Sequence, residues 1–289
     1  MKLINFYLLF LLALFSQSCA KELIDDGFFK LSDGGKTMEI HIDKGENLKS
    51  KLNSFDAFGI ETMVISGHIG GHTLSFLRDL SGGNDSELLG GRNLGRLDIS
   101  AVFFYSSDEV YYVREGQELK IKPLSSFPPY AFENCYTLNT IIFPETIFGG
   151  YSIIGKGAFK NCLLLRYVEW GKGIREIEEE AFMDCSTLSL GEPLVLPEPL
   201  KEIGDYAFKN TIPLEVDLPS SVTLIGEEAF SPILGNVIIR SINPPTITNN
   251  SFVFDKKSDK ILFVPIESVA KYNIEPYKNI FSEIRGVDL

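Results

Sequence analysis

One dipeptide, Ala-Phe, returns five times between residues 131 and 230 and limits the folds that this chain can adopt. Successive copies are 27, 23, 26 and 22 residues apart. The copies are Ala131-Phe132, Ala158-Phe159, Ala181-Phe182, Ala207-Phe208 and Ala229-Phe230. A unit of this length cannot bury its apolar face alone, whereas stacked units share a continuous core. The spacing therefore predicts a solenoid, with each pair at the same turn of successive coils.

The residues around each pair repeat as well. An isoleucine stands four positions before four of the alanines, at Ile154, Ile177, Ile203 and Ile225. After the pairs come short alternating apolar stretches that end in Pro or Gly, at residues 141–144, 168–171, 194–197 and 216–219. Each stretch predicts a strand of about four residues, because proline stops the hydrogen-bond ladder and lets the chain turn. We expect an α/β solenoid with short strands on one face and irregular or helical turns on the other.

Strand alternation predicts which side chains face outward. If Ile141 and Phe143 face the core, then Thr140 and Ile142 face solvent. The same rule exposes Tyr167, Glu169, Val195, Glu215, Asp217, Ile238 and Arg240. Exposed aromatic and charged residues on a rigid face suit recognition, so Tyr167, Glu169, Glu215, Asp217 and Arg240 are the candidate ligand-binding residues. The alternative is a passive sheet surface, with binding on the N-terminal region or the loops.

Three cysteines follow the repeat. Cys135, Cys162 and Cys185 each stand four residues after the alanine, where Thr211 and Ile233 stand in the last two copies. Equivalent positions of adjacent coils lie about 5 Å apart, a distance that permits one disulfide. A thiolate metal site is less suited, since a straight row makes a poor tetrahedron. We expect small buried apolar residues at these positions, and the alternative is a single disulfide.

Other candidates for chemistry are weak. His68 and His72 have the spacing of a helical metal pair, with His41 as a third ligand, but Gly70-Gly71 between them disfavours a helix and no zincin glutamate follows. We therefore expect turn histidines and no metal. Glu178-Glu179-Glu180 is expected to be a solvated acidic run. The sequence contains no nucleophile elbow, phosphate-binding glycine loop or Cys-His pair, so we predict no enzyme activity and no cofactor.

The first residues have the organisation of an export signal. A basic start precedes an apolar run over residues 3–15, which is too short to span a bilayer. Ser16-Gln17-Ser18 followed by Cys19 resembles a lipobox, and this resemblance implies a signal peptide over residues 1–18, lipidation of Cys19 and a tether over residues 19–36. An ordinary signal peptide, with Cys19 removed or left as a free thiol, is the alternative.

Charge and hydrophobicity restrict the partners. The formal charge of −12 becomes −13 when Lys2 is removed with the signal peptide, and no basic block interrupts it. Nucleic acid is therefore excluded as an expected partner. The hydrophobic fraction of 44% is enough for a large core, so disorder is excluded too.

Acidic residues such as Asp25 and Asp26 resemble the tract that sends some bacterial lipoproteins to the outer face, although a solvated tether explains them equally well.

Residues 37–118 lack the repeat. Alternation over residues 37–42, 62–65 and 94–99 predicts strands, while leucine spacing predicts helices over residues 46–55 and 73–80. A solenoid needs its first coil covered, so we expect an α+β N-terminal capping region.

The combination of Leu-Pro, Ile-Gly, Ala-Phe, Asn-Cys and Leu resembles the BspA-like leucine-rich repeat over residues 119–255. Residues 256–289, with Ile261 to Pro265 and Ser268 to Tyr272, resemble the closing segment of such proteins and are expected to form a C-terminal cap. The resemblance implies a curved leucine-rich-repeat solenoid and a role in adhesion or recognition.

Two functions of different class follow. The first is an outer-membrane lipoprotein at the cell surface that binds an extracellular protein or glycan. The alternative is a structural or accessory envelope lipoprotein that acts within a complex.

Overall fold

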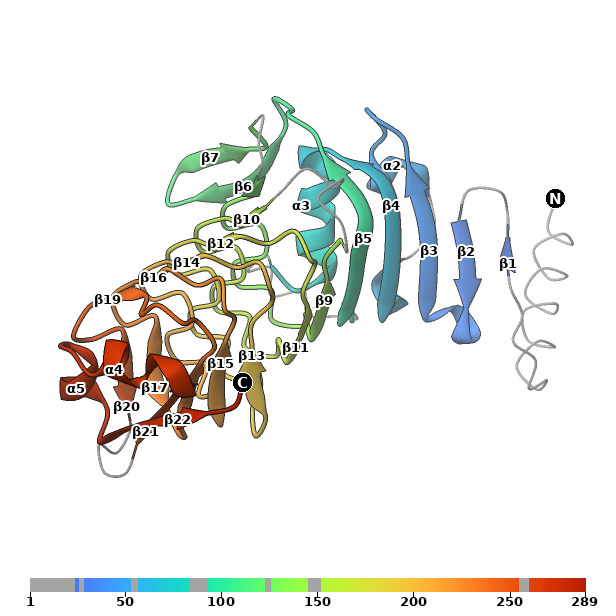
Figure 1. The fold of residues 1–289 in the computed structure, drawn as a ribbon. Coiled ribbons are helices and arrows are strands. Elements are labelled where there is room, and N and C mark those ends of the chain that lie inside the picture. The colour runs from blue at the N-terminus through green and yellow to red at the C-terminus, as the bar shows by residue number, and fades with distance from the viewer. Residues whose placement is uncertain are drawn as a thin grey trace, which may run out of the picture.

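The computed structural model describes residues 24–25, 29–52, 57–83, 93–122, 126–144, 152–254 and 260–289. Figure 1 shows coils stacked from the N-terminal sheet to the C-terminal helices, with strands along one side. The expected solenoid is therefore confirmed. The predicted signal peptide and Cys19 lie outside the described residues.

The strand side begins with a seven-stranded sheet in the order β1-β2-β3-β4-β5-β9-β11. Its strands are β1 (Ile24–Asp25), β2 (Phe29–Ser32), β3 (Thr37–Ile42), β4 (Thr62–Ile69), β5 (Arg96–Phe104), β9 (Thr140–Ile142) and β11 (Tyr167–Glu169). The three N-terminal strands expected from alternation are confirmed, although β4 and β5 end later than expected and β5 also begins later, at Arg96. Since β5 pairs in parallel with β9, the N-terminal region and the first coils share one sheet.

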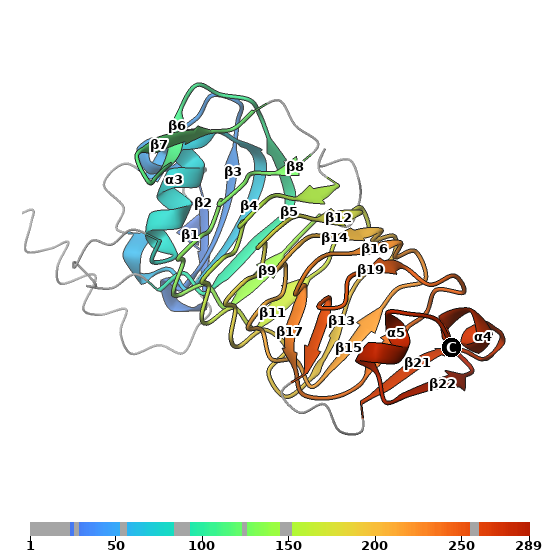
Figure 2. The same ribbon diagram turned by 90° about the vertical axis from the view of Figure 1, so that its left-hand side faces the viewer.

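A five-stranded sheet continues the strand side toward the C-terminus, in the order β13-β15-β18-β21-β22. Its strands are β13 (Pro193–Val195), β15 (Glu215–Leu218), β18 (Val237–Ile239), β21 (Ile261–Pro265) and β22 (Glu283–Val287). Between β21 and β22 the chain forms η5 (Ile266–Ser268), α4 (Val269–Tyr272) and α5 (Tyr277–Ile280), and η5 and α4 pack against β22. Figure 2 shows these helices at the end of the stack.

The turn side carries a ladder of its own. Six two-residue strands pair in parallel: β8 (Ser126–Phe127), β10 (Ile153–Ile154), β12 (Glu176–Ile177), β14 (Glu202–Ile203), β16 (Leu224–Ile225) and β19 (Thr246–Ile247). A two-stranded sheet joins β17 (Phe230–Ile233) to β20 (Phe252–Phe254). In the described part of these coils the turns contain no helix, so the irregular form of the expected turns is the observed one.

The Ala-Phe repeat builds the core. Phe159, Phe182, Phe208 and Phe230 stack with ring centroids 5.2 to 5.3 Å apart and nearly parallel planes. Phe252 extends the stack, 5.6 Å from Phe230. Each ring is buried, as are the alanines beside them. Near-identical spacing along the stack shows that the coils keep one register on this side.

Arg78 joins the N-terminal region to the first coil. It lies on α3 (Gly71–Leu80), which with α2 (Leu48–Leu52) accounts for the two expected helices, α2 being shorter than expected. Along the stack, Phe132 N–H donates to Ala158 C=O of the next coil at 2.7 Å. The first coil has no coil before it, and the buried Arg78 guanidinium supplies the missing donors to Ala131 C=O at 2.8 Å and Glu133 C=O at 3.1 Å.

A hairpin covers the same end. It consists of β6 (Val110–Arg114) and β7 (Gln117–Lys120), and Tyr111 donates from its hydroxyl to Pro129 C=O at 2.6 Å. The Tyr112 ring lies 3.7 Å from the Arg78 guanidinium carbon. At the other end, the buried Tyr272 and Tyr277 hydroxyls donate to Ser241 C=O and Pro245 C=O. Side-chain donors therefore occupy backbone carbonyls at both ends of the stack.

Candidate functional site

The strand side is interrupted between the second and third coils. Among the described strands, β11 pairs only with β9 and β13 only with β15, so the two sheets do not join here. The cause is an insertion. Val168 follows Leu165 by three residues, as Ile141 follows Leu138, but Leu194 follows Leu188 by six. The three extra residues form a turn, with Glu192 N–H donating to Ser189 C=O at 2.9 Å, and this turn holds β13 away from β11.

The interruption forms a groove, which we call the sheet-break groove. It has a volume of about 370 Å³. Its lining comes from β5, β9, β11, the inserted turn and β13, with Arg96, Arg166, Tyr167, Glu169, Trp170, Glu192 and Val195 as the residues that matter below. Tyr167 and Val195 are exposed, with 46% and 56% of their surface accessible. A concave site with aromatic, apolar and charged groups has the make-up of a binding site.

Arg166 fixes one wall of the groove. Its Nε donates to the Tyr167 hydroxyl at 2.9 Å, which orients the exposed ring. Its Nη2 donates to Leu190 C=O at 3.4 Å and lies 3.8 Å from the Glu192 carboxylate, so the same guanidinium anchors the inserted turn. Trp170 packs edge-on against Phe182 of the ring stack, with centroids 5.5 Å apart. The groove is therefore built on the rigid core.

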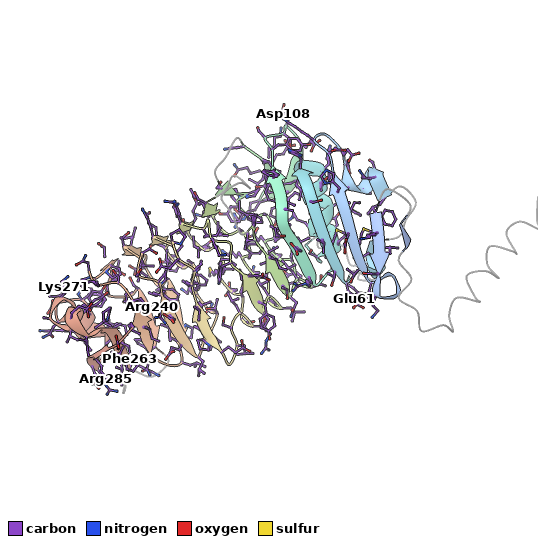
Figure 3. All side chains as sticks on the ribbon, turned by 45° about the vertical axis from the view of Figure 1, so that its right-hand side comes forward. Glu61, Asp108, Arg240, Phe263, Lys271 and Arg285 are labelled. Carbon is purple, nitrogen blue, oxygen red and sulfur yellow. The ribbon has the colours of Figure 1, made fainter. Side chains whose placement is uncertain are left out.

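The predicted ligand-binding residues fall into two groups. Tyr167 and Glu169 line the sheet-break groove together with Val195. Glu215, Asp217 and Arg240 do not line it and belong to the five-stranded sheet and its end. Figure 3 labels Arg240 over the coils of the C-terminal half. The structure thus brings two of the five candidates together at the groove.

The expected exposure of three outward residues is wrong. Thr140 and Ile142 are buried, because they stand in mid-sheet between the neighbours in register on β5 and β11. Asp217 is only 8% exposed. Both Asp217 carboxylate oxygens accept hydrogen bonds from the Arg240 guanidinium at 2.8 Å, so Arg240 covers it. This bond also raises the pKa of Arg240. Asp217 is therefore committed to an internal pair.

The cysteines are buried, and no disulfide joins Cys135, Cys162 and Cys185. The Cys162 and Cys185 thiols donate to Phe132 C=O and Phe159 C=O of the preceding coil at 3.0 and 3.1 Å. Burial raises the pKa of the Cys135 thiol to about 12 and holds the pKa of Cys162 well above its usual value. These groups are neutral small side chains that link successive coils.

The histidines had been expected to lie in turns, and this prediction is wrong. His68 lies within β4 and stacks on Phe103 at 5.6 Å, and His72 lies in the first turn of α3. Gly70 and Gly71 stand at the start of this helix in close contact with Tyr105 and Glu109, where a Cβ atom would collide. Within the described residues no three His, Cys, Asp or Glu side chains come together as a metal-binding group.

A second hollow lies on the turn side. It has a volume of about 360 Å³, and Lys156, Glu176, Glu178, Glu179 and Glu202 are among its lining residues. The Lys156 ammonium pairs with Glu179 at 2.6 Å. Burial, and then the charges of Glu178 and Glu202, raise the pKa of Glu176. The run Glu178-Glu179-Glu180 is thus partly paired rather than simply solvated, since Glu180 also pairs with Lys160 at 2.8 Å.

Sequence reasoning missed several residues of the sheet-break groove. Arg96, Arg166, Trp170 and Glu192 had not been selected. One signal was available, because the spacing from Leu188 to Leu194 exceeds the spacing in the two earlier coils by three residues.

Sequence reasoning also missed a sixth coil. Its signal was the spacing of Ile247, which stands four residues before Ser251-Phe252, with serine in place of alanine.

The coils and their strand-side groove define a repeat protein of the leucine-rich class. The family model described as BspA type Leucine rich repeat region matches six copies, over residues 106–235 and 189–277. Together these matches span more than half of the chain, and the chain belongs to this family. Across the described residues no helix combines the length and apolarity needed to cross a membrane.

Three solved structures resemble the chain at low identity. A leucine-rich-repeat protein of T. pallidum shares 15% identity over 93% of this chain and 100% of its own, with a TM-score of 0.35. The pneumococcal vaccine antigen PcpA shares 14% over 87% of this chain and 68% of its own, with a TM-score of 0.46. A leucine-rich cell surface protein from Faecalibacterium prausnitzii shares 11% over 93% and 96%, with a TM-score of 0.34. A search of curated proteins finds no match.

Proposed function

We propose that this chain is a cell-envelope lipoprotein, held by lipid at Cys19 in the outer membrane, that binds an extracellular protein or glycan and has no enzymatic activity. The observation that carries the proposal is the sheet-break groove, where Tyr167 and Glu169 meet Arg96 and Arg166 on a rigid wall. Leucine-rich-repeat proteins generally bind rather than catalyse, which agrees with this site. The export signal in residues 1–18 supports placement in the envelope.

Binding is tested on arrays of extracellular matrix proteins and of glycans. The Tyr167→Ala/Glu169→Ala double variant should lose saturable binding, because both side chains line the groove. Tyr136→Ala/Glu202→Ala is the matched control, since these exposed residues lie outside the groove lining. Normal binding by the first variant would exclude the groove as the site.

Location is tested separately. Protease added to intact cells should cleave the solenoid while a periplasmic control protein survives. Cys19→Ala should abolish incorporation of labelled palmitate and release the protein from the membrane fraction. Protection from protease until lysis, with co-purification of envelope proteins, would replace surface adhesion by the accessory role within an envelope complex.

A further inference from the structure

The backbone on one side of the sheet-break groove carries hydrogen-bonding groups that no described strand uses. Tyr167 N–H donates to Asn139 C=O at 3.1 Å, and Glu169 C=O accepts from Phe143 N–H at 3.0 Å. Both residues therefore direct their backbone groups toward β9. Because alternate residues of a strand direct these groups to opposite sides, Val168 directs its N–H and C=O toward the groove.

The other side of the groove has the complementary arrangement. Glu192 C=O accepts from Leu214 N–H at 3.2 Å, and Leu196 N–H donates to Asp217 C=O at 3.1 Å, so these residues face β15. By the same alternation, Pro193 and Val195 direct their backbone groups toward the groove. Proline occurs at strand edges because it has no N–H to contribute. Pro193 thus agrees with an edge that no strand among the described residues completes.

The space between the two edges suits a short length of extended chain. With a rise of about 3.3 Å per residue, a strand spacing of about 4.8 Å and a depth of about 10 Å, the groove holds roughly two to three residues. This number of residues follows from dividing the groove volume of about 370 Å³ by the volume of one residue of extended chain. Exposed edges promote pairing with other chains, and natural proteins usually shorten, charge or cover them. Here two edges face each other in the middle of the solenoid.

Charges beside the groove add a side-chain requirement. Arg96 and Tyr167 stand in one cross-strand row through Thr140, and Glu169 stands two residues further along β11. In the described structure, neither Arg96 nor Glu169 forms an ion pair or side-chain hydrogen bond. A bound strand has the same two-residue period. An acidic and a basic residue at alternate positions of that strand would match this pair of charges.

We propose that the sheet-break groove binds an extended polypeptide segment by strand addition, through the backbone of Val168 and Val195. The inference rests on the proposed binding function and names the partner class as a polypeptide rather than a glycan. Main-chain hydrogen bonds supply affinity in this mode of recognition, and alternate side chains supply specificity. The preferred segment carries an acidic and a basic residue two positions apart.

The test uses random heptapeptides displayed on phage, selected on the full mature chain. Selected peptides are synthesised and their Kd is measured by fluorescence polarisation. Val195→Pro removes a groove-facing N–H that makes no hydrogen bond to β15, in a strand that already holds Pro193 in the same orientation, and should weaken binding about ten-fold or more. Val195→Thr changes the side chain and keeps the N–H, so it should lose less affinity than Val195→Pro. Tyr136→Ala/Glu202→Ala, outside the groove lining, is the control and should bind within about two-fold of wild type. Circular dichroism verifies that these variants are folded.

Two further measurements examine the backbone directly. N-methylation along a selected peptide should weaken binding at each of two to three consecutive residues, because successive amides of a strand held between two edges face β11 and β13 in turn. Deletion of residues 190–192 places Leu194 three residues after Leu188, as in the two earlier coils, and should abolish binding by letting β13 pair with β11.

The outcomes separate this inference from the proposed function. Failure to select any peptide, wild-type affinity in Val195→Pro, or tolerance of N-methylation at every position of the peptide would overturn strand addition. If Tyr167→Ala/Glu169→Ala still loses its array ligand in that case, the groove recognises side-chain or glycan features and the proposed function stands. N-methyl effects at consecutive residues, together with weaker binding by Val195→Pro, would establish the polypeptide class.

Discussion

The two sides of the solenoid differ in the continuity of their strand ladders, although both are built from the same repeat. On the turn side, six short strands and a stack of phenylalanine rings run without interruption through the coils. On the strand side, the ladder breaks between β11 and β13. Both sides belong to the same coils, so the break is local and the register of the core is unaffected.

The difference shows where this fold tolerates change. Insertion of three residues before β13 removes strand pairing, yet Phe159 and Phe182 remain 5.2 Å apart. The turn side therefore sets the spacing of the coils, and the strand side can vary. In a solenoid stabilised by contacts between neighbouring units, a change at one strand can open a groove while the stacking of the other side persists. The sheet-break groove is such a case.

The largest effect is expected from breaking the uninterrupted side. Phe182→Ala should lower the free energy of unfolding by about 3 to 5 kcal/mol, because a fully buried ring is replaced by a cavity between two stacked neighbours. Urea unfolding monitored by circular dichroism measures this loss. Tyr167→Ala, at the exposed groove, is the control and should stay within about 0.5 kcal/mol of wild type. A loss below about 1 kcal/mol for Phe182→Ala would contradict the role given to the ring stack.

The next effect concerns the start of the same side. Arg78→Leu leaves Ala131 C=O and Glu133 C=O without the guanidinium donors, and should cost about 2 to 4 kcal/mol of the free energy of unfolding. Arg78→Lys keeps the charge without the planar fork and should recover only part of this. Hydrogen exchange should rise first in the coil of Phe132. Uniform exchange along the stack would show that Arg78 does not act as an end cap.

The sequence was informative where a pattern repeats. Spacing of the Ala-Phe pairs predicted the solenoid and the placement of each pair at the same turn of successive coils. Local alternation likewise predicted β3 with both ends correct. These features follow from side chains a few residues apart, or at a fixed period, and such patterns are visible in one chain.

Features that depend on distant segments were not predictable in the same way. Arg78 is buried because it reaches a turn more than fifty residues later, which nothing near it in the sequence indicates. Asp217 was expected to be exposed, but its cover comes from Arg240 in the next coil. Of the candidate site, Tyr167 and Glu169 followed from alternation, whereas the groove itself needed the length of the inserted turn to be compared between coils.

A smaller loss in the free energy of unfolding is expected from a change on the strand side away from the groove. Asp217→Ala should cost about 1 kcal/mol of the free energy of unfolding, because it removes a two-bond pair with Arg240 that is only partly shielded from water. The cost should shrink as salt is added, since Arg240 is partly exposed. Heptapeptide binding at the sheet-break groove should be unchanged. Weaker binding would mean that the five-stranded sheet and the groove are coupled.

The smallest effect comes from a disadvantage of uniform stacking, which places identical charges in one row. Glu176 of β12 pairs in register with Glu202 of β14, and burial followed by the charges of Glu178 and Glu202 raises the pKa of Glu176. A carboxyl whose pKa is higher in the folded state contributes stability that is present below the unfolded value of 4.5 and lost as pH rises through the folded value. Glu176→Gln should therefore raise stability at neutral pH, by no more than about 0.5 kcal/mol because the site is screened by water.

This gain should vanish below the unfolded pKa, where glutamate and glutamine are both neutral. Thermal unfolding of both proteins from pH 4 to pH 7 measures the difference. Glu202→Gln removes one of the two neighbouring charges and should give a smaller gain in the same direction. A loss of stability in Glu176→Gln at neutral pH would show that the row of glutamates is held by favourable contacts. In that case the glutamates, like the phenylalanine rings, would stabilise the stacking of coils on the turn side, and the turn side would differ still more from the interrupted strand side.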